Sequence, residues 1–203
     1  MRSFTHVISL GNRCATAYNL RRHFSFGDGH LFDWWITPYP GLLALLDNLS
    51  ADWLYDPASL EMLPDNRAVR HRPSGIELTH DFPRVGKHAG PVTVDFLDYL
   101  DRPKSRAGYL IDKLKGLNCP GERILFVREA AVTSALSERL AALLPLARFE
   151  VASIEPVANL GDWRGDPALW DAALASLEAR LIGDHKPFSE PGEVQPVLRT
   201  TDA

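Results

Sequence analysis

Three runs of consecutive apolar and β-branched residues constrain the fold of this chain most strongly. They occupy residues 4–10, 123–128 and 149–154, and each is followed by a stretch with helical spacing. Such runs are typical of strands that are buried on both faces of a sheet. Because these strands alternate with helices, the sequence predicts an α/β fold, a three-layer sandwich around a mainly parallel sheet.

Helical spacing accounts for much of the remaining chain. Helices are predicted over residues 14–24, 38–49, 136–144 and 167–183. Residues 94–114 have the apolar spacing of a helix on both sides of Pro103, which predicts a break there. Residues 76–80 alternate between apolar and polar side chains like a half-buried strand, whereas residues 50–74 predict irregular structure.

Length and composition predict one domain with a polar tail. The chain has 203 residues, of which 45% are hydrophobic and 24% are charged, an ordinary globular composition with enough residues for a core. Residues 1–183 are predicted to form a single α/β domain. Residues 184–203 are polar and rich in proline, so this C-terminal tail is predicted to be flexible.

Charge and cysteine content narrow the function classes. The formal net charge of −4 argues against a nucleic-acid partner. No apolar run is long enough for a membrane helix, and the first run is too short for a signal peptide, so we expect a cytoplasmic protein. Two cysteines, Cys14 and Cys119, exclude a disulfide scaffold and a zinc site built on thiolates. Nucleotide-binding and metal-binding motifs are absent from the sequence, so no cofactor and no metal is expected.

Four residues with reactive or charged side chains lie at or just after the ends of predicted strands. They are Cys14, His80, Arg128 and Glu155. In open α/β sheets ligands bind beyond the carboxyl ends of the strands, so this placement indicates a site. The expected ligand is a small molecule, a peptide or a glycan, and the oligomeric state is left open.

Cys14 is the candidate nucleophile. It opens the predicted helix after the turn at Gly11, Asn12 and Arg13, where unpaired N–H groups and the helix dipole favour a thiolate. Arg13 adds positive charge, and Asn12 is a candidate donor to an oxyanion. The alternative is a small buried residue that packs the helix against the sheet, which is where free cysteines usually lie.

His80 is the candidate partner of Cys14, because a thiol nucleophile needs an imidazole that takes its proton. Asp33 lies in an aromatic run and is the candidate acid that orients His80, with the capping of a turn as an equal alternative. Asp81 is a competing acid, although neighbouring residues on a strand point to opposite faces. Trp34 is a candidate pocket wall, but core packing is the commoner role of such aromatic residues.

Arg128 ends the second predicted strand and is a candidate ligand for a carboxylate or a phosphate. The alternative is a surface ion pair with Glu129 or Glu155. Cys119 lies in a predicted turn next to proline and glycine, and we assign it no role.

Five short motifs follow one another along the chain. They are Ser9-Leu10-Gly11-Asn12-Arg13-Cys14, Leu20-Arg21-Arg22, Phe32-Asp33-Trp34, His80-Asp81-Phe82 and Phe126-Val127-Arg128. In this order they resemble a bacterial family described as papain-like cysteine peptidases of unknown function. The resemblance implies that Cys14 and His80 are the family's cysteine and histidine, and that Asp33 is the acid of its Phe-Asp-Trp motif. It also implies a papain-like α+β fold as the alternative architecture, and a link to polysaccharide metabolism.

Three functions remain open. The first is a cysteine-dependent hydrolase or acyl transferase in which Cys14 attacks, His80 moves the proton and Asp33 orients His80. The second is a carbohydrate-binding or nucleotide-sugar-binding domain, or a transferase, with Arg128, Trp34 and Asp33 in its cleft. The third is a non-catalytic interaction domain.

Overall fold

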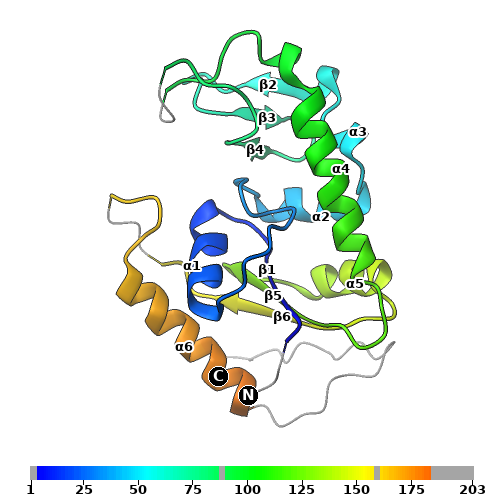
Figure 1. The fold of residues 1–203 in the computed structure, drawn as a ribbon, viewed down its shortest axis with the longest axis vertical. Coiled ribbons are helices and arrows are strands. Elements are labelled where there is room, and N and C mark those ends of the chain that lie inside the picture. The colour runs from blue at the N-terminus through cyan, green and yellow to red at the C-terminus, as the bar shows by residue number, and fades with distance from the viewer. Residues whose placement is uncertain (1–3, 87–89, 158–160, 184–203) are drawn as a thin grey trace, which may run out of the picture.

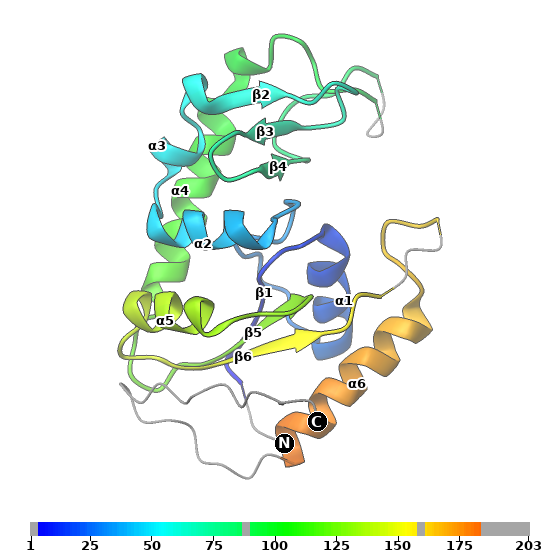
Figure 2. The ribbon, with the colours of Figure 1, turned by 180° about the vertical axis from the view of Figure 1, so that it is seen from behind.

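The computed structural model describes residues 4–86, 90–157 and 161–183, with side chains as far as residue 179. Within these ranges the chain forms two separate three-stranded sheets (Figure 1, Figure 2). The predicted flexible tail lies outside the described residues. In the ranges given above, the helices are too short or too polar to cross a membrane.

The first sheet is parallel, as predicted. Its strands are β1 (His6–Ser9), β5 (Arg123–Glu129) and β6 (Arg148–Ile154), in the spatial order β1-β5-β6. Ile8 lies opposite Phe126 in the first pair, and Phe126 lies opposite Val151 in the second. The three apolar runs of the sequence therefore form one sheet, with β5 at its centre.

Helices surround the parallel sheet. They are α1 (Cys14–Phe24), α2 (Tyr39–Asp47), α5 (Ser134–Leu143) and α6 (Pro167–Gly183). Val127 of β5 belongs to the same apolar cluster as Trp170 of α6, whereas its neighbour Phe126 belongs to the cluster that contains Leu136 of α5. Successive strand residues face opposite sides of a sheet, so β5 is buried from both sides. The predicted mixed α/β architecture is confirmed.

The second sheet is antiparallel, with the order β2-β3-β4. Its strands are β2 (Leu60–Met62), β3 (Val69–His71) and β4 (Ile76–Leu78), preceded by α3 (Ala51–Leu54) and η1 (Pro57–Ser59). The prediction of irregular structure over residues 50–74 is wrong, because strands of three residues are too short to show an alternating pattern. Neither sheet closes into a barrel in the described part of the chain.

The bend after β4 starts earlier than predicted. The strand ends at Leu78, so Thr79 and His80 lie in the bend and not on the strand. Their side chains therefore do not follow the alternation of a strand.

The helix α4 (Asp101–Gly116) is continuous and runs alongside both sheets (Figure 1). A short 3-10 helix, η2 (Phe96–Tyr99), precedes it. The predicted break at Pro103 is wrong. Pro103 lies in the first turn of α4, where a helix does not need the N–H group that proline lacks.

One buried apolar cluster extends across both sheets. It contains Phe126 of β5, Leu78 of β4 and Ile111 of α4. A smaller cluster lies between the opposite face of the parallel sheet and α6. A single three-layer sandwich is too simple a description of the whole chain, because the antiparallel sheet is an additional unit packed on the same core.

Candidate functional site

The turn between β1 and α1 positions the first candidate residue. Gly11 and Asn12 both adopt a left-handed backbone, with φ of 74° and 81°. A Cβ at Gly11 would lie 2.7 Å from Oγ1 of Thr37, so glycine is required there. Asn12 is a residue type that tolerates the left-handed region. Arg13 returns to an extended backbone, and Cys14 begins α1.

The Cys14 thiol lies beside Thr79. Its Sγ is 3.9 Å from Thr79 Oγ1, and the Thr79 hydroxyl donates to the carbonyl oxygen of Trp34 at 2.7 Å. Because the hydroxyl proton is engaged by Trp34, the thiol is the donor in its contact with Thr79. This arrangement holds a protonated thiol.

Burial raises the pKa of the Cys14 thiol above its ordinary value, and the charges of Asp33 and Asp81 act in the same direction. The backbone hydrogen bond at Cys14 opposes this rise without cancelling it. The lowering of the thiol pKa that is expected at a helix start is thus outweighed by the rise that burial causes. Cys14 is half-buried, so its thiol keeps partial access to solvent.

His80 follows Thr79 directly. Its ring packs edge-on against Trp34, with 5.7 Å between the ring centroids. In the described residues the structure shows no hydrogen bond between His80 and Cys14, whose side-chain contact is Thr79. The structure therefore brings the predicted pair into the same neighbourhood but not into direct contact.

Partial burial lowers the pKa of His80. The charges of Arg84 and Arg106 lower it further, and the charge of Asp81 opposes them. His80 is therefore neutral at neutral pH and able to accept a proton.

Asp33 is buried and connects the segment of Trp34 to α1. Its carboxylate forms an ion pair with Arg21 and accepts a hydrogen bond from the backbone N–H of His30 at 2.5 Å. Burial raises the pKa of Asp33 to about 6, although the His30 N–H and Arg21 favour the charged form. The predicted contact with His80 is not found in the described part of the structure. Asp33 and Arg21 instead hold the segment that carries Trp34. The guanidinium carbon of Arg21 lies 5.5 Å from the centroid of the Trp34 ring.

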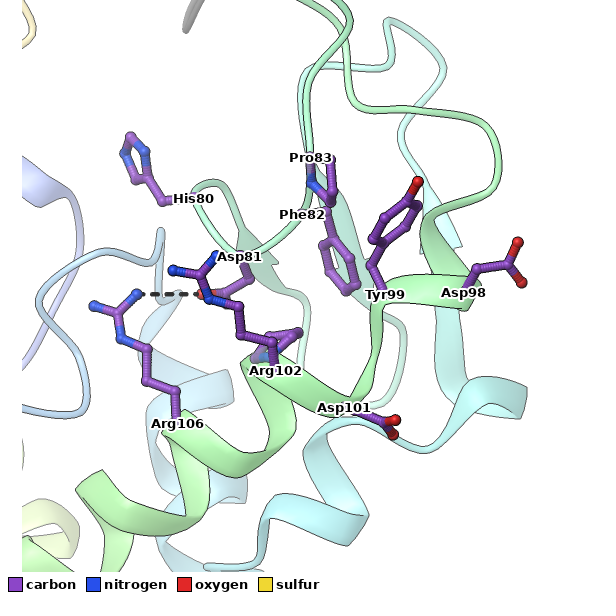
Figure 3. Close-up of a pocket in the computed structure, with 10 residues that line it drawn as sticks. His80, Asp81, Phe82, Pro83, Asp98, Tyr99, Asp101, Arg102 and Arg106 are labelled. Atoms are coloured by element: carbon purple, nitrogen blue, oxygen red, sulfur yellow. Dashed lines mark ion pairs between the residues drawn. The ribbon is translucent and has the colours of Figure 1, made fainter.

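Asp81 is a buried acid at the edge of the bend. It accepts hydrogen bonds from Trp35 Nε1 and from the Tyr55 hydroxyl, both at 2.7 Å, and lies 4.0 Å from Arg106. Burial raises the pKa of Asp81. Figure 3 shows its carboxylate directed to Arg106, while the ring of His80 is directed away from it. The two neighbours thus point in different directions, and Asp81 does not orient His80.

Arg128 is buried and ties two loops to β5. Its guanidinium donates to the carbonyl oxygens of Leu10 and Thr37, at 2.7 and 2.8 Å, and lies over the Tyr39 ring at 5.4 Å. Only 1% of Arg128 is exposed. These contacts replace both the predicted ligand role and the predicted surface ion pair.

Arg13 is also tied to the protein. It forms an ion pair with Glu129 at the end of β5 and donates to the carbonyl oxygen of Val157. Glu129 is fully buried and accepts a further hydrogen bond from the Val157 N–H at 2.8 Å. Arg13 and Arg128 thus hold the turn before Cys14 from two sides, and neither is presented to a ligand.

A cavity of about 680 Å³ lies between the bend after β4 and the first turns of α4 (Figure 3). The residues that line it include His80, Asp81, Phe82, Tyr99, Arg102 and Arg106. This volume is within the range of small-molecule sites. The sequence reasoning did not identify Arg102 and Arg106. The signal that could have found them is their spacing of four residues, which places both on one face of a helix.

No group of three or more His, Cys, Asp or Glu side chains is placed to hold a metal ion, as far as the structure describes the chain. No protein-family model, curated protein or solved structure matches the chain. The resemblance to papain-like cysteine peptidases therefore stays a prediction. Cys14, His80 and the cavity that His80 lines are the features from which a function can be argued.

Proposed function

We propose that the protein is a cysteine-dependent acyl hydrolase or acyl transferase, with Cys14 as the nucleophile and His80 as the general base. One observation carries the proposal: a half-buried thiol at the start of α1 contacts Thr79, whose chain neighbour His80 lines a ligand-sized cavity. Consecutive Cα atoms are about 3.8 Å apart, so the Cα atom of His80 is that distance from the Cα atom of Thr79, the residue that contacts the thiol. The proposal requires the His80 ring to turn from Trp34 to the thiol when substrate binds, since catalytic hydrogen bonds often tighten only in the complex.

The pair is proposed to be neutral before reaction. The raised pKa of Cys14 keeps the thiol protonated, and the lowered pKa of His80 keeps the imidazole unprotonated at neutral pH. His80 would therefore remove the proton during the attack, with no preformed thiolate and imidazolium.

In the first step the Cys14 sulfur forms a bond to the acyl carbon of the substrate, the thiol proton moves to His80, and the carbonyl π electrons move to oxygen. The tetrahedral intermediate collapses to a thioester as the bond to the leaving group breaks, and the imidazolium returns its proton to that group. Water, or an acceptor hydroxyl in a transfer reaction, then attacks the thioester while His80 takes its proton. The sulfur leaves and receives that proton, which restores the neutral pair.

The first turn of α1 is the proposed oxyanion site. Backbone N–H groups in the first turn of a helix have no partner within the helix, and the helix dipole favours negative charge there. Asn12 lies beside them in the preceding turn. Asp33 and Arg21 keep a positioning role, because they hold the segment of Trp34 against which His80 packs.

The cellular location, the substrate class and the layered architecture of the parallel sheet are part of the same proposal. The acidic net charge and the two free cysteines support a cytoplasmic enzyme whose substrates are small molecules, peptides or glycans and not nucleic acid. For the parallel sheet and the helices around it, the proposed arrangement is a three-layer α/β sandwich.

An activated ester such as para-nitrophenyl acetate tests the proposal. We expect it to acylate Cys14 in a single-turnover burst, with the site identified by peptide mass spectrometry. Cys14→Ser removes this labelling, and His80→Ala slows it by about 10²–10⁴-fold. Cys119→Ser is the matched control, because Cys119 is exposed and follows the C-terminal end of α4, whereas His80 and the cavity lie at the first turns of that helix, so its removal leaves the burst unchanged. Equal acylation of both cysteines, or an unchanged rate in His80→Ala, contradicts the proposal.

A second candidate function is a glycan- or nucleotide-sugar-binding domain, or a glycosyl transferase. The observation that favours it is the ligand-sized cavity lined by Arg102 and Arg106, which does not need the thiol. Full activity of Cys14→Ser on a glycosyl substrate would select this candidate over the first.

A further inference from the structure

The first two turns of α4 present two arginines to the cavity. Arg102 and Arg106 are four residues apart, so they lie on the same side of the helix, and both are exposed. Figure 3 shows both guanidinium groups on the side of the cavity that carries Asp81. Asp98 and Asp101 also line the cavity, but Figure 3 shows their carboxylates directed away from the two guanidinium groups.

Nearby carboxylates do not balance these two charges. Arg106 lies 4.0 Å from Asp81, which already accepts two other hydrogen bonds. Arg102 has no ion-pair partner among the residues that the structure describes. The cavity therefore has two guanidinium groups and a single buried carboxylate at this end.

Further positive charge reinforces this imbalance. Like charges one helical turn apart repel each other, and the helix dipole disfavours a cation in the first turn, where Arg102 lies. Arg84 is close enough to lower the pKa of His80. Its guanidinium is bonded to backbone carbonyl oxygens and, in the described chain, to no carboxylate. An anion in the cavity would relieve both the repulsion between Arg102 and Arg106 and the unfavourable interaction of Arg102 with the helix dipole.

We propose that this cavity binds the phosphate group of an organic phosphate, held by Arg102 and Arg106. Guanidinium groups form paired hydrogen bonds with phosphate oxygens and stay charged throughout the physiological pH range. A phosphate fills only part of about 680 Å³, and the rings of Phe82 and Tyr99 offer contacts to the remainder of the molecule. The inference rests on the proposed function in one respect, because it makes this phosphate part of the acyl substrate.

Three consecutive residues connect the thiol to the phosphate site. Thr79 contacts Cys14, His80 follows, and Asp81 lies beside Arg106. An extended chain advances about 3.3–3.6 Å per residue, so the Cα atoms of Thr79 and Asp81 are at most about 7 Å apart. A substrate anchored by its phosphate at Arg102 and Arg106 would extend along His80 toward the thiol. The substrate class is therefore an acyl compound that also carries a phosphate group.

An NMR titration of the full-length Cys14→Ala protein with inorganic phosphate, at constant ionic strength, tests the inference. We expect saturable shifts of backbone signals at the start of α4, and none with acetate. Arg102→Gln should weaken phosphate binding by about tenfold or more, the effect of losing one charge-assisted contact. Lys104→Gln is the matched control: it removes the same charge from the same turn, where Lys104 is paired with Asp52 at 2.7 Å, and leaves phosphate binding unchanged.

Three results overturn the inference: an unchanged phosphate affinity in Arg102→Gln, an equal loss in Lys104→Gln, or acetate binding as strong as phosphate binding. The Cys14→Ala background separates this inference from the proposed function. A failed ester burst with intact, Arg102-dependent phosphate binding removes the acyl chemistry and keeps the phosphate site. An intact burst without phosphate binding removes only the phosphate site.

Discussion

Replacing Arg128 by methionine tests whether this arginine is a structural tie or a ligand-binding residue. Methionine keeps a long apolar stem but removes the guanidinium, which donates to the carbonyl oxygens of Leu10 and Thr37. Both carbonyl groups belong to loops that lead to the site, the first just before Cys14. Because Arg128 is only 1% exposed, water does not readily replace the lost donors.

The expected loss follows from these two contacts. Hydrogen bonds to a charged group contribute about 1.5–3 kcal/mol each, so the pair contributes about 3–6 kcal/mol. Removing the guanidinium also removes the unfavourable burial of its charge, a cost that shows in the lowered pKa of Arg128. We therefore expect Arg128→Met to lower the free energy of unfolding by about 2–4 kcal/mol. Arg128→Lys should lose less, because an ammonium group can still reach one carbonyl.

Urea unfolding followed by tryptophan fluorescence measures this effect as a lower midpoint at an unchanged slope. The control is Arg148→Met, since Arg148 is exposed at the start of β6 and its replacement should change the free energy of unfolding by at most about 0.5 kcal/mol. If Arg128→Met were as stable as Arg148→Met but had lost phosphate binding, the structural role would be refuted in favour of a ligand role.

Two further predictions concern the same region. Gly11→Ala should destabilise the protein by about 2–5 kcal/mol in thermal unfolding, because φ is 74° and the new Cβ would meet Thr37; a loss below about 1 kcal/mol would contradict this. Asp33→Asn should change the pH dependence of stability. The pKa of Asp33 is raised to about 6 in the folded state, so its deprotonation destabilises the fold as pH rises from about 4 to 6. The free energy of unfolding of the wild type, measured with urea, should therefore fall relative to that of Asp33→Asn over this window, by up to about 3 kcal/mol. The opposite sign would show that the ion pair with Arg21 outweighs burial.

The long elements of the fold could be predicted because their patterns are local. The helix at residues 14–24 and the apolar runs of β5 and β6 repeat their signal over many residues. Of the antiparallel sheet only β4 was predicted, from the alternation at residues 76–80. The strands β2 and β3 were missed, since each has three residues and depends on pairing with its neighbours. Pro103 gave the wrong prediction because proline has opposite consequences in the first turn of a helix and in its interior.

The site was predictable only in part, because contacts between distant residues leave no mark in the local sequence. The strand-turn-helix pattern placed Cys14 at the start of α1. Nothing in that pattern shows that Asp33 pairs with Arg21, or that Thr79, and not His80, contacts the thiol. Arg102 was missed for the same reason, since it lines a cavity only because α4 lies beside the bend after β4.

The shared core also determines how the cavity can select its ligands. The bend after β4 and the helix α4 form its two walls, and Leu78 and Ile111 anchor them in one buried cluster with exposed fractions of 0% and 3%. Close-packed interiors resist expansion, so the two walls cannot separate unless these side chains leave the core. The width of the opening is then set by residues that do not line the cavity. Size selectivity in this protein should accordingly respond to substitutions at Leu78 or Ile111 as strongly as to substitutions in the cavity itself.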